Sequence, residues 1–355
     1  MTTHPSAHIA PEIANALRTL AAEAEQLQQL HPAQLAIIFE NNWFNVFVPK
    51  THNGLQLSLP EVLQLEEALA WADGSVGWTI TLCAGAGWFV GFLNAELGTT
   101  IFEHSKVCLA GSGKASGKAT ITTDGYEISG LWDYATGANA ATAFTANCVI
   151  EQNGVPLKNG DGSLLIRAFL FLKEEVTIHE NWKRMGMTAT GSHSFGVQKI
   201  TVNKNRAFII DPQHAVLKDP VYQYPFLQLA ETTLAVNSSG MAMRFLELCV
   251  PIAEKRSTTA MLLILKNAVQ QMETARQLFY ATVITSWQEC CNNLSISSTV
   301  LQNVSSASKA LAITSRKMVE ELYPYCGMQA ANPETELNRV WRNLHTASQH
   351  SIFND

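Results

Sequence analysis

Residues 117–134 read "GKATITTDGYEISGLWDY", two segments of alternating apolar and polar residues on either side of Asp124-Gly125. Alternation with a period of two is typical of a half-buried β-strand, and an Asp-Gly pair is typical of a tight hairpin turn. The stretch therefore predicts a β-hairpin. More alternating segments follow, with Asn153-Gly154 as another turn and no helical pattern between them. Strands at this spacing predict a compact antiparallel β-barrel over residues 104–222.

Helical patterns flank this region on both sides. Residues 11–30, "PEIANALRTLAAEAEQLQQL", repeat apolar side chains at helical spacing after a proline at the first helical position. Near the end of the chain, three long amphipathic stretches and the segment 339–350 predict four helices joined by short loops, which form an antiparallel bundle. The sequence thus predicts an α+β protein, with an N-terminal helical domain (1–103), the β-barrel domain and a C-terminal helical bundle (223–355).

One uncharged stretch, residues 75–95, is long enough to span a bilayer, which needs about 20 apolar residues. Acidic residues flank it, among them Asp73 and Glu96, where lysine or arginine would anchor a membrane span. Gly85 and Gly87 also interrupt it. We therefore expect no membrane span but a pair of buried helices hinged at these glycines, because glycine lets the backbone approach a neighbour closely.

The composition excludes several classes of partner. The chain has 355 residues, of which 47% are hydrophobic and 15% charged, so a globular protein with an ample core is expected. A net charge of −6 without a basic run argues against nucleic acid or an anionic membrane surface. The seven cysteines form no C-x-x-C pair and the N-terminus has no secretory pattern. Reduced thiols and a cytoplasmic location are therefore expected.

The order of helices, β domain and bundle is the layout of the acyl-CoA dehydrogenase superfamily, and four motifs resemble those of its members. They are "EEALAWADGSVGWTITL" (66–82), "DGYEISGLWDYATGANAAT" (124–142), "NWKRMGMTATGSHSFGVQKITV" (181–202) and "RVWRNLHTASQH" (339–350). The last is similar to the final-helix motif of the flavin-dependent two-component hydroxylases, where "WRD" precedes a histidine. The resemblance covers essentially the whole chain. It implies FAD or FMN, used as reduced flavin from a separate reductase, and a small-molecule substrate.

An isoalloxazine ring needs an apolar wall and hydrogen-bond donors for its carbonyls and ring nitrogens. The segment "WDYATG" offers a wall at Trp132 and Tyr134, a donor near N5 at Thr136, and close approach at Gly137. The segment "TATGSHS" supplies further candidates: Thr188, Thr190, Gly191 and Ser192. Each also fits an ordinary turn at the end of a strand, and the resemblance favours the flavin. It also makes Arg256 the candidate partner of the FAD pyrophosphate.

The final helix carries two histidines, His345 and His350. At about 100° per residue they lie about 140° apart, so they cannot bind one metal as histidines at i, i+4 do, and no metal site is expected. Both flank the apolar stripe, where a histidine either faces solvent or lines a cleft. The resemblance favours His350, because the hydroxylase branch places its active-site histidine eight residues after the motif arginine, here Arg342. A neutral imidazole with an ordinary pKa of about 6.5 can move a substrate proton at neutral pH.

Three functions remain open. The first is the oxygenase component of a flavin-dependent monooxygenase that acts on a small, aromatic or heteroatom-containing substrate through Thr136 and His350. The second is an acyl-CoA dehydrogenase or oxidase. Its usual base would stand at Ser351, which cannot serve, so Glu231 becomes the candidate unless it merely complements a helix dipole. The third is an inactive flavin-binding homologue, since Ala86 stands where many hydroxylases have a histidine. The superfamily implies a homotetramer or a homodimer.

Overall fold

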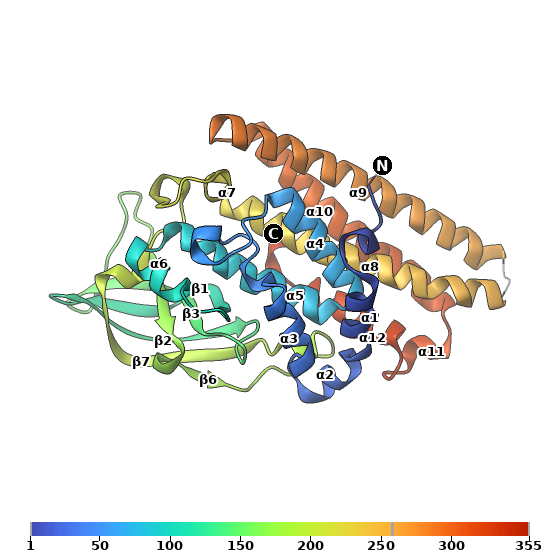
Figure 1. Ribbon diagram of the computed structural model, residues 1–355, viewed down its shortest axis with the longest axis horizontal. Coiled ribbons are helices and arrows are strands. Elements are labelled where there is room, and N and C mark those ends of the chain that lie inside the picture. Colours follow the sequence, from blue (N-terminus) through green and yellow to red (C-terminus); the bar gives the residue numbers. More distant parts are fainter. Residues whose placement is uncertain (1, 257–258, 354–355) are drawn as a thin grey trace.

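Three zones follow one another in the computed structural model, which describes residues 2–256 and 259–353 (Figure 1). The first zone is helical: α1 (Pro11–Thr19), α2 (Ala21–Leu27), α3 (Pro32–Glu40), α4 (Leu59–Ala72), α5 (Gly74–Gly87) and α6 (Ala95–Phe102). Strands follow: β1 (Leu109–Ile121), β2 (Gly125–Ala135), β3 (Ala143–Gln152), β4 (Val155–Pro156), β5 (Ile166–Leu172), β6 (Thr177–His179), β7 (His193–Asn203) and β8 (Ala207–Phe208). The last zone is helical again: α7 (Pro220–Gln223), α8 (Phe226–Arg256), α9 (Thr259–Asn293), α10 (Ser298–Leu322), α11 (Met328–Ala331) and α12 (Glu336–Ala347). The predicted α+β class is confirmed, while the boundaries at residues 103 and 222 stay predictions.

The sheet differs from the predicted barrel in two ways. In the described residues it has eight strands in the order β6-β7-β2-β1-β3-β5-β8, with β4 beside β3, so the path is open and the predicted closed barrel is wrong. The predicted hairpin is present, since β1 and β2 are antiparallel with Ile121 opposite Tyr126. However, β1 and β3 are parallel. After Ala135 the chain crosses over the end of β1 and starts β3 on its other edge, at Ala143 opposite Leu109.

The turn between α4 and α5 fixes the direction of both helices. α4 begins at a capping box, in which the Ser58 amide donates to the Glu61 carboxylate at 2.8 Å. α5 begins at Asp73, whose carboxylate accepts from the Val76 amide at 2.9 Å. The Asp73-Gly74 pair therefore ends one helix and begins the next.

α5 is the apolar stretch that the sequence singled out. The helical run Gly74–Phe92 is long and apolar enough to cross a membrane by length and composition, but 83% of its most apolar window is buried inside the protein. The α-helix continues unbroken through Gly85 and changes to a 3-10 helix at Trp88. The predicted hinge between two helices is therefore wrong. A Cβ at Gly77 would lie 2.5 Å from the Cα of Ala70, so this glycine is what allows α5 to pack closely on α4.

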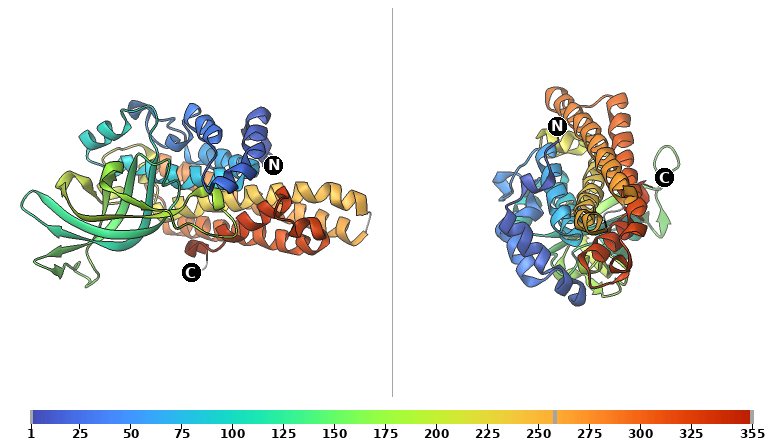
Figure 2. Two further views of the ribbon diagram at one scale, coloured as in Figure 1. Left: turned by 90° about the horizontal axis from the view of Figure 1, so that it is seen from below. Right: turned by 90° about the vertical axis from the view of Figure 1, so that its right-hand side faces the viewer.

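The C-terminal helices form the predicted bundle. α8, α9, α10 and α12 pack against one another, and α8 also packs on α4 and α5. Figure 2 shows the long helices α8 to α10 extending side by side away from the sheet. The first turn of α8 lies near the sheet, and its 31 residues carry the other end about 45 Å away at a rise of about 1.5 Å per residue.

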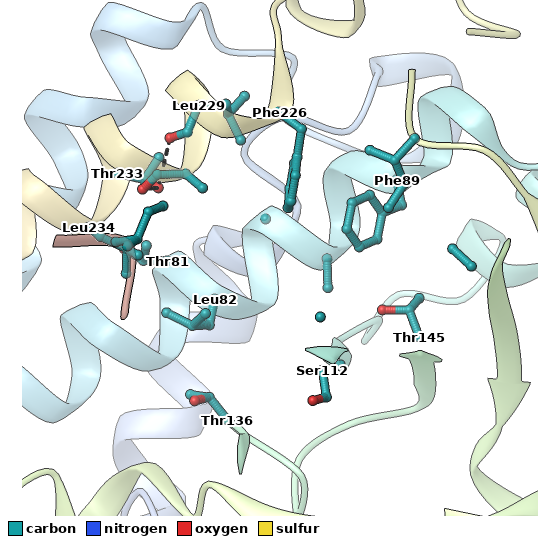
Figure 3. A pocket seen from close by; sticks show the side chains of 18 of the residues that line it. Thr81, Leu82, Phe89, Ser112, Thr136, Thr145, Phe226, Leu229, Thr233 and Leu234 are labelled. Carbon is teal, nitrogen blue, oxygen red and sulfur yellow. Dashed lines mark hydrogen bonds between the residues drawn. The ribbon is translucent and has the colours of Figure 1, made fainter. Parts of the chain in front are cut away.

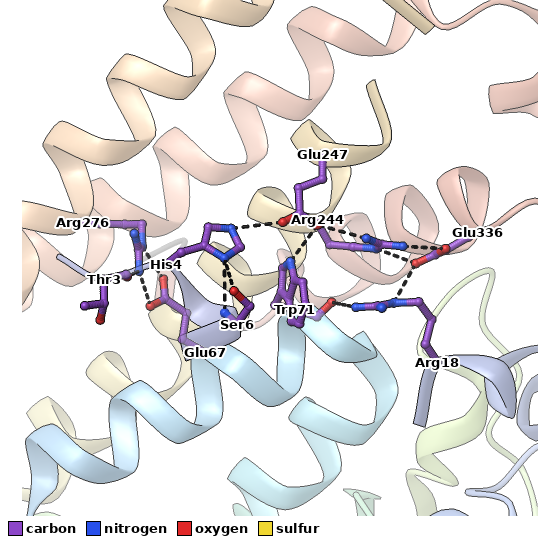
Figure 4. A network of polar contacts seen from close by, with 10 residues as sticks. All are labelled: Thr3, His4, Ser6, Arg18, Glu67, Trp71, Arg244, Glu247, Arg276 and Glu336. Atoms are coloured by element: carbon purple, nitrogen blue, oxygen red, sulfur yellow. Dashed lines mark hydrogen bonds and ion pairs between the residues drawn. The ribbon is translucent and has the colours of Figure 1, made fainter. Parts of the chain in front are cut away.

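A network of polar contacts ties residues 2–10, here called the N-terminal arm, to α4 and the bundle (Figure 4). Buried Arg276 on α9 forms an ion pair with buried Glu67 on α4 at 2.7 Å and donates to the carbonyl of Thr3 at 2.8 Å. Glu247 on α8 contacts the His4 ring at 3.1 Å and accepts from the Trp71 indole at 2.9 Å. The arm therefore follows the α4–bundle contact and covers it.

Candidate active site

Two cavities meet where α5, the sheet and the end of α12 come together. The inner cavity has a volume of about 270 Å³ and the outer cavity about 610 Å³. Leu82, Thr136 and His350 line both of them. Two of the predicted site residues, Thr136 and His350, therefore lie at the junction, one contributed by the sheet and the other by the segment after α12.

Apolar side chains make most of the inner cavity (Figure 3). α5 contributes Leu82 and Phe89, and the first turns of α8 contribute Phe226, Leu229 and Leu234. The polar groups on its wall are the His350 ring and the following hydroxyl and amide side chains: Thr81, Ser112, Thr136, Thr145, Asn147 and Thr233. Within the described residues no lysine, arginine, aspartate or glutamate lines this cavity. The inner cavity is therefore suited to an uncharged molecule.

Aromatic rings and one cation form the rim of the outer cavity. The Arg184 guanidinium lies 4.9 Å from the centre of the Trp182 ring and 5.9 Å from that of Tyr134. The Tyr134 and Trp182 rings meet edge to face at 6.2 Å. Tyr134 has a φ of +67° beside a register shift in the β2–β7 ladder, and its side chain is 62% exposed. The bulge turns Tyr134 outward, so a flat ligand can lie against these rings.

A chain of hydroxyl groups decides which way Thr136 directs its proton. Thr190 donates to the Met187 carbonyl at 2.8 Å, and its oxygen lies 2.7 Å from that of Ser192. The Ser192 oxygen in turn lies 2.8 Å from that of Thr136. Because each hydroxyl has one proton, Ser192 donates to Thr190 and Thr136 donates to Ser192. In this chain of hydrogen bonds Thr136 presents oxygen lone pairs to the two cavities, which places it as an acceptor, whereas the sequence predicts a donor.

His350 contributes a neutral ring to the junction. Burial lowers the pKa of this imidazole below its ordinary value. The ring meets Trp78 of α5 edge to face at 6.0 Å, and its Nδ1 accepts from the Ile352 amide at 3.3 Å. In a neutral imidazole that accepts at Nδ1, the proton is carried by Nε2. His350 thus places a neutral ring at the junction of the two cavities.

Trp132 does not form the wall that the sequence predicted. Its side chain is fully buried in the core of the sheet, where its ring stacks on Phe195 at 5.3 Å and its indole N–H donates to the Asn147 carbonyl at 2.9 Å. It lines neither cavity. The bulge before Ala135 separates the two aromatic residues of the motif, and it places Trp132 in the core and Tyr134 at the cavity.

Three other predicted contacts serve the backbone instead. The Gly137 amide donates to the Thr190 carbonyl at 2.9 Å, which joins the two turns to each other. Gly137 and Gly191 line a small hollow of about 20 Å³ on the side of Gln29, away from the outer cavity. The Thr188 hydroxyl donates to the Arg184 carbonyl at 3.5 Å and lines neither cavity. These residues shape the turns and line neither of the two cavities, and their contact with a flavin stays a prediction.

Glu231 and Arg256 lie away from both cavities. The Glu231 carboxylate faces α10, where it accepts from the Ser305 hydroxyl, and Glu231 lines neither cavity. It is therefore not placed to act as the predicted base of an acyl-CoA dehydrogenase. The residues of α8 that do line the inner cavity are Phe226, Leu229, Ala230, Thr233 and Leu234. Arg256 stands at the far end of α8, where it donates to the Tyr325 carbonyl at 2.8 Å. It cannot reach a flavin held in the outer cavity of its own chain.

Sequence reasoning missed part of the outer cavity. Trp182 and Arg184 lie in the motif 181–202, in which only two threonines, Gly191 and Ser192 are predicted site residues. An arginine two residues after a tryptophan could have indicated a cation–π pair at the site. His345 also lines the outer cavity, and its Nδ1 lies 2.8 Å from the Trp341 carbonyl. Ser351, the position where a dehydrogenase would carry its base, lines the outer cavity too.

Known proteins share this architecture. Residues 227–355 match the family model described as acyl-CoA dehydrogenase, C-terminal domain. An indole-3-acetate monooxygenase of Acinetobacter baumannii is 26% identical over 323 residues, which are 88% of this chain and 81% of that protein. The HsaA monooxygenase of Mycobacterium tuberculosis has a TM-score of 0.89 at 20% identity, covering 98% of this chain and 93% of that one. TdsC of Paenibacillus, solved with FMN and indole, has a TM-score of 0.81 at 18% identity, covering 98% and 94%.

The chain has the fold of these solved structures, and residues 227–355 match the acyl-CoA dehydrogenase C-terminal domain, so the predicted resemblance to that superfamily is confirmed. Within this class, relatives that the chain matches over most of its length are flavin-dependent monooxygenases. The predicted resemblance to the two-component hydroxylase branch is therefore confirmed as well.

Proposed function

We propose that this protein is the oxygenase component of a two-component flavin-dependent monooxygenase, which uses reduced FMN or FAD and O₂ on a small aromatic substrate. The names of its relatives favour this function over an acyl-CoA dehydrogenase. Two structural neighbours carry a flavin, FMN in TdsC and FADH₂ in XiaF of Streptomyces. A separate reductase would then supply the reduced flavin.

The outer cavity has the groups that a flavin ring requires. Tyr134 and Trp182 provide aromatic surface, and Arg184 provides a cation beside it. Thr136 accepts a hydrogen bond from a ring N–H, a group that reduced flavin carries at N5. Reduced flavin supplies two electrons to O₂, so that one oxygen atom enters the substrate and the other leaves as water. The inner cavity, which joins the outer one at Leu82, holds the substrate.

The observation that carries this proposal is the placement of Thr136 and His350 on either side of the junction. Thr136 orients the ring from the sheet. His350 lies where the two cavities meet, and burial lowers its pKa, so that a neutral ring is present there to take part in the transfer of the substrate proton. The apolar inner wall excludes water from the reacting atoms.

A dehydrogenase needs a carboxylate aimed at the substrate, and in the described part of the chain neither cavity has one in its lining. The outer cavity has Ser351 instead, and Glu231 is bound to Ser305. We further propose that the protein is cytoplasmic and forms a homo-oligomer. Exposed apolar side chains along the bundle support the association of several copies: Leu262, Leu263, Leu278, Ile284 and Ile313.

Isotope-labelled O₂ tests the function directly. The protein is mixed anaerobically with chemically reduced FMN or FAD and indole, labelled O₂ is then admitted, and the product is analysed by mass spectrometry. We expect one labelled oxygen atom in the product. His350→Gln should lower the yield about 10²- to 10⁴-fold, whereas Thr188→Val, a change outside both cavities, should not. If a panel of aromatic compounds gains no label with either flavin, the proposed function is wrong.

A further inference from the structure

The size and walls of the inner cavity define what it can hold. Its volume of about 270 Å³ exceeds the roughly 150 Å³ of an engineered apolar cavity that binds benzene, so it has room for one or two fused aromatic rings. Phe89 and Phe226 lie 5.5 Å apart at an angle of 46° and close one end of it. Such walls stabilise a flat apolar ligand through ring contacts.

The wall offers no cation to a carboxylate. No lysine or arginine lines the inner cavity in residues 2–256 and 259–353, the His350 ring there is neutral, and buried Thr81, Thr136 and Thr233 are hydrogen-bonded to neighbouring groups. Thr233, for example, donates to the Leu229 carbonyl at 3.0 Å. An ionised group that enters loses its hydration and finds no opposite charge, so its binding is disfavoured relative to that of the neutral parent molecule.

One polar position on the wall has an unusual partner. Thr81 of α5 lines the cavity, and its oxygen accepts from the Asn237 side-chain amide at 2.6 Å. Behind it lies Glu66 of α4, which is fully buried. In the described part of the chain neither Glu66 oxygen has a hydrogen-bond partner of good geometry, and the Asn237 carbonyl oxygen has none either. Native proteins pair nearly all buried polar atoms, so this cluster is built for more than packing.

The number of protons and lone pairs at Thr81 shows what it can bind. One of its lone pairs takes the Asn237 amide, and its one proton is directed to the Glu66 carboxyl, whose pKa this hydrogen bond holds down in part. The second lone pair remains for the cavity. Thr81 is therefore an acceptor held in place from behind by Glu66 and Asn237, which act as positioning residues.

From the cavity and this cluster we infer the substrate class: an uncharged aromatic molecule of one or two rings with a ring N–H or a hydroxyl group, whose hydrogen bond is accepted by Thr81. The inference rests on the proposed function and deepens it. The Acinetobacter relative acts, by its name, on indole-3-acetate, which carries a carboxylate. This chain selects the neutral parent ring instead.

Binding to the protein–reduced-flavin complex under anaerobic conditions tests the inference without turnover. Calorimetry would compare indole, indole-3-acetate and indene, which has the indole shape without the N–H. We expect indole to bind about tenfold or more tightly than indole-3-acetate. Thr81→Val should weaken indole binding about two- to tenfold and leave indene binding unchanged. Thr79→Val, a change two residues away on α5 but outside both cavities, is the matched control.

Thr81→Ser keeps the hydroxyl and should retain the preference for indole over indene, which guards against a loss that comes from misfolding. Equal or tighter binding of indole-3-acetate would overturn the inference, and so would a Thr81→Val variant that weakens indole and indene alike. These outcomes differ from failure of the proposed function. If indole binds as expected but no aromatic product gains labelled oxygen, the selectivity stands and the monooxygenase assignment falls.

Discussion

Glu66 and Glu67 are neighbours on α4, and both are almost completely buried, at 0% and 1% exposure, yet their surroundings are opposite. Glu67 faces the N-terminal arm, where it receives an ion pair from Arg276 and hydrogen bonds from Tyr280 and Ser239. Glu66 faces the wall of the inner cavity, where Thr81 is the nearby polar group. A turn of about 100° between consecutive helical residues is enough to separate the two environments.

The difference extends to the regions on either side of α4. The arm side holds paired charges: Arg18, Arg244, Glu247 and Glu336 continue the network that begins at Arg276 (Figure 4). The cavity side holds titratable groups whose burial favours the neutral form. Burial raises the pKa of Glu66 well above its ordinary value, which the Thr81 hydroxyl opposes only in part, and burial lowers the pKa of His350. One side secures the fold, and the other keeps the substrate site free of charge.

The largest effect is expected from leaving one buried charge of the arm side without its partner. Arg276→Leu strands the Glu67 carboxylate, and we expect a loss of about 3–5 kcal/mol in the free energy of unfolding. Urea denaturation measures it. The matched control is Arg316→Leu, which removes an exposed arginine paired with Glu320 at 3.5 Å and should cost less than about 1 kcal/mol. Equal losses in the two variants would show that the buried pair is not special.

The double variant Arg276→Leu/Glu67→Leu sharpens the same point. Removing both charges leaves no stranded carboxylate, and replacing a buried pair by apolar groups of similar volume is often neutral or stabilising. We therefore expect the double variant to recover most of the stability lost by Arg276→Leu. If the losses of the single variants simply add, the pair contributes through packing and not through charge.

Glu66→Gln should have the next effect, and its sign depends on pH. The pKa of Glu66 is raised in the folded state, so its contribution to stability is full below about 4.5, the ordinary value, and is lost as the pH rises through the folded pKa. Relative to the wild type, Glu66→Gln should therefore gain stability in urea denaturation as the pH rises above about 4.5. A difference that stays constant with pH would mean that folding does not shift the pKa of Glu66.

Some of this contrast could be predicted from the sequence. The motifs identified Tyr134, Thr136, Ser192 and His350 as site residues, and all four line the outer cavity. Residue type and order along the chain were sufficient to identify these four. The period of two places Trp132 and Tyr134 on the same face of a strand, and only the bulge before Ala135 separates them. A bulge depends on pairing with another strand, so the local sequence does not reveal it.

The other errors have the same physical origin. The parallel pairing of β1 and β3 is decided by where the chain passes after β2, which hairpin signals do not specify. The direction of Glu231 depends on the rotation of α8 against α10, which is set by packing along the whole helix. Glu66 and Glu67 were visible only as acidic residues before an apolar stretch. Their opposite partners come from α5 and α9, far away in sequence.

On the cavity side, the neutral form of His350 predicts a displaced pH profile. Because burial lowers the pKa of this imidazole below 6.5, the ring remains neutral under weakly acidic conditions. If the neutral ring moves the proton, kcat/KM should decline only below about pH 6.5 as the pH is lowered. Product formation measured across pH in the presence of saturating reduced flavin tests this. An acidic decline centred above that value would mean that the site stabilises the charged imidazole, and the contrast between the two sides would fail.

The smallest effect is expected at the outer end of the arm network. His4 contacts Glu247 at 3.1 Å, but its side chain is 37% exposed, so water screens the interaction. His4→Ala should lower the free energy of unfolding by about 0.2–1 kcal/mol, and the loss should shrink in high salt. This small value is informative because the contact of His4 with Glu247 and the contact of Arg276 with the Thr3 carbonyl both tie the same arm to the bundle. If His4→Ala lowered the free energy of unfolding as much as Arg276→Leu does, burial would not explain why one charged contact stabilises the protein more than the other. The stability would then depend on the attachment of the arm as a whole.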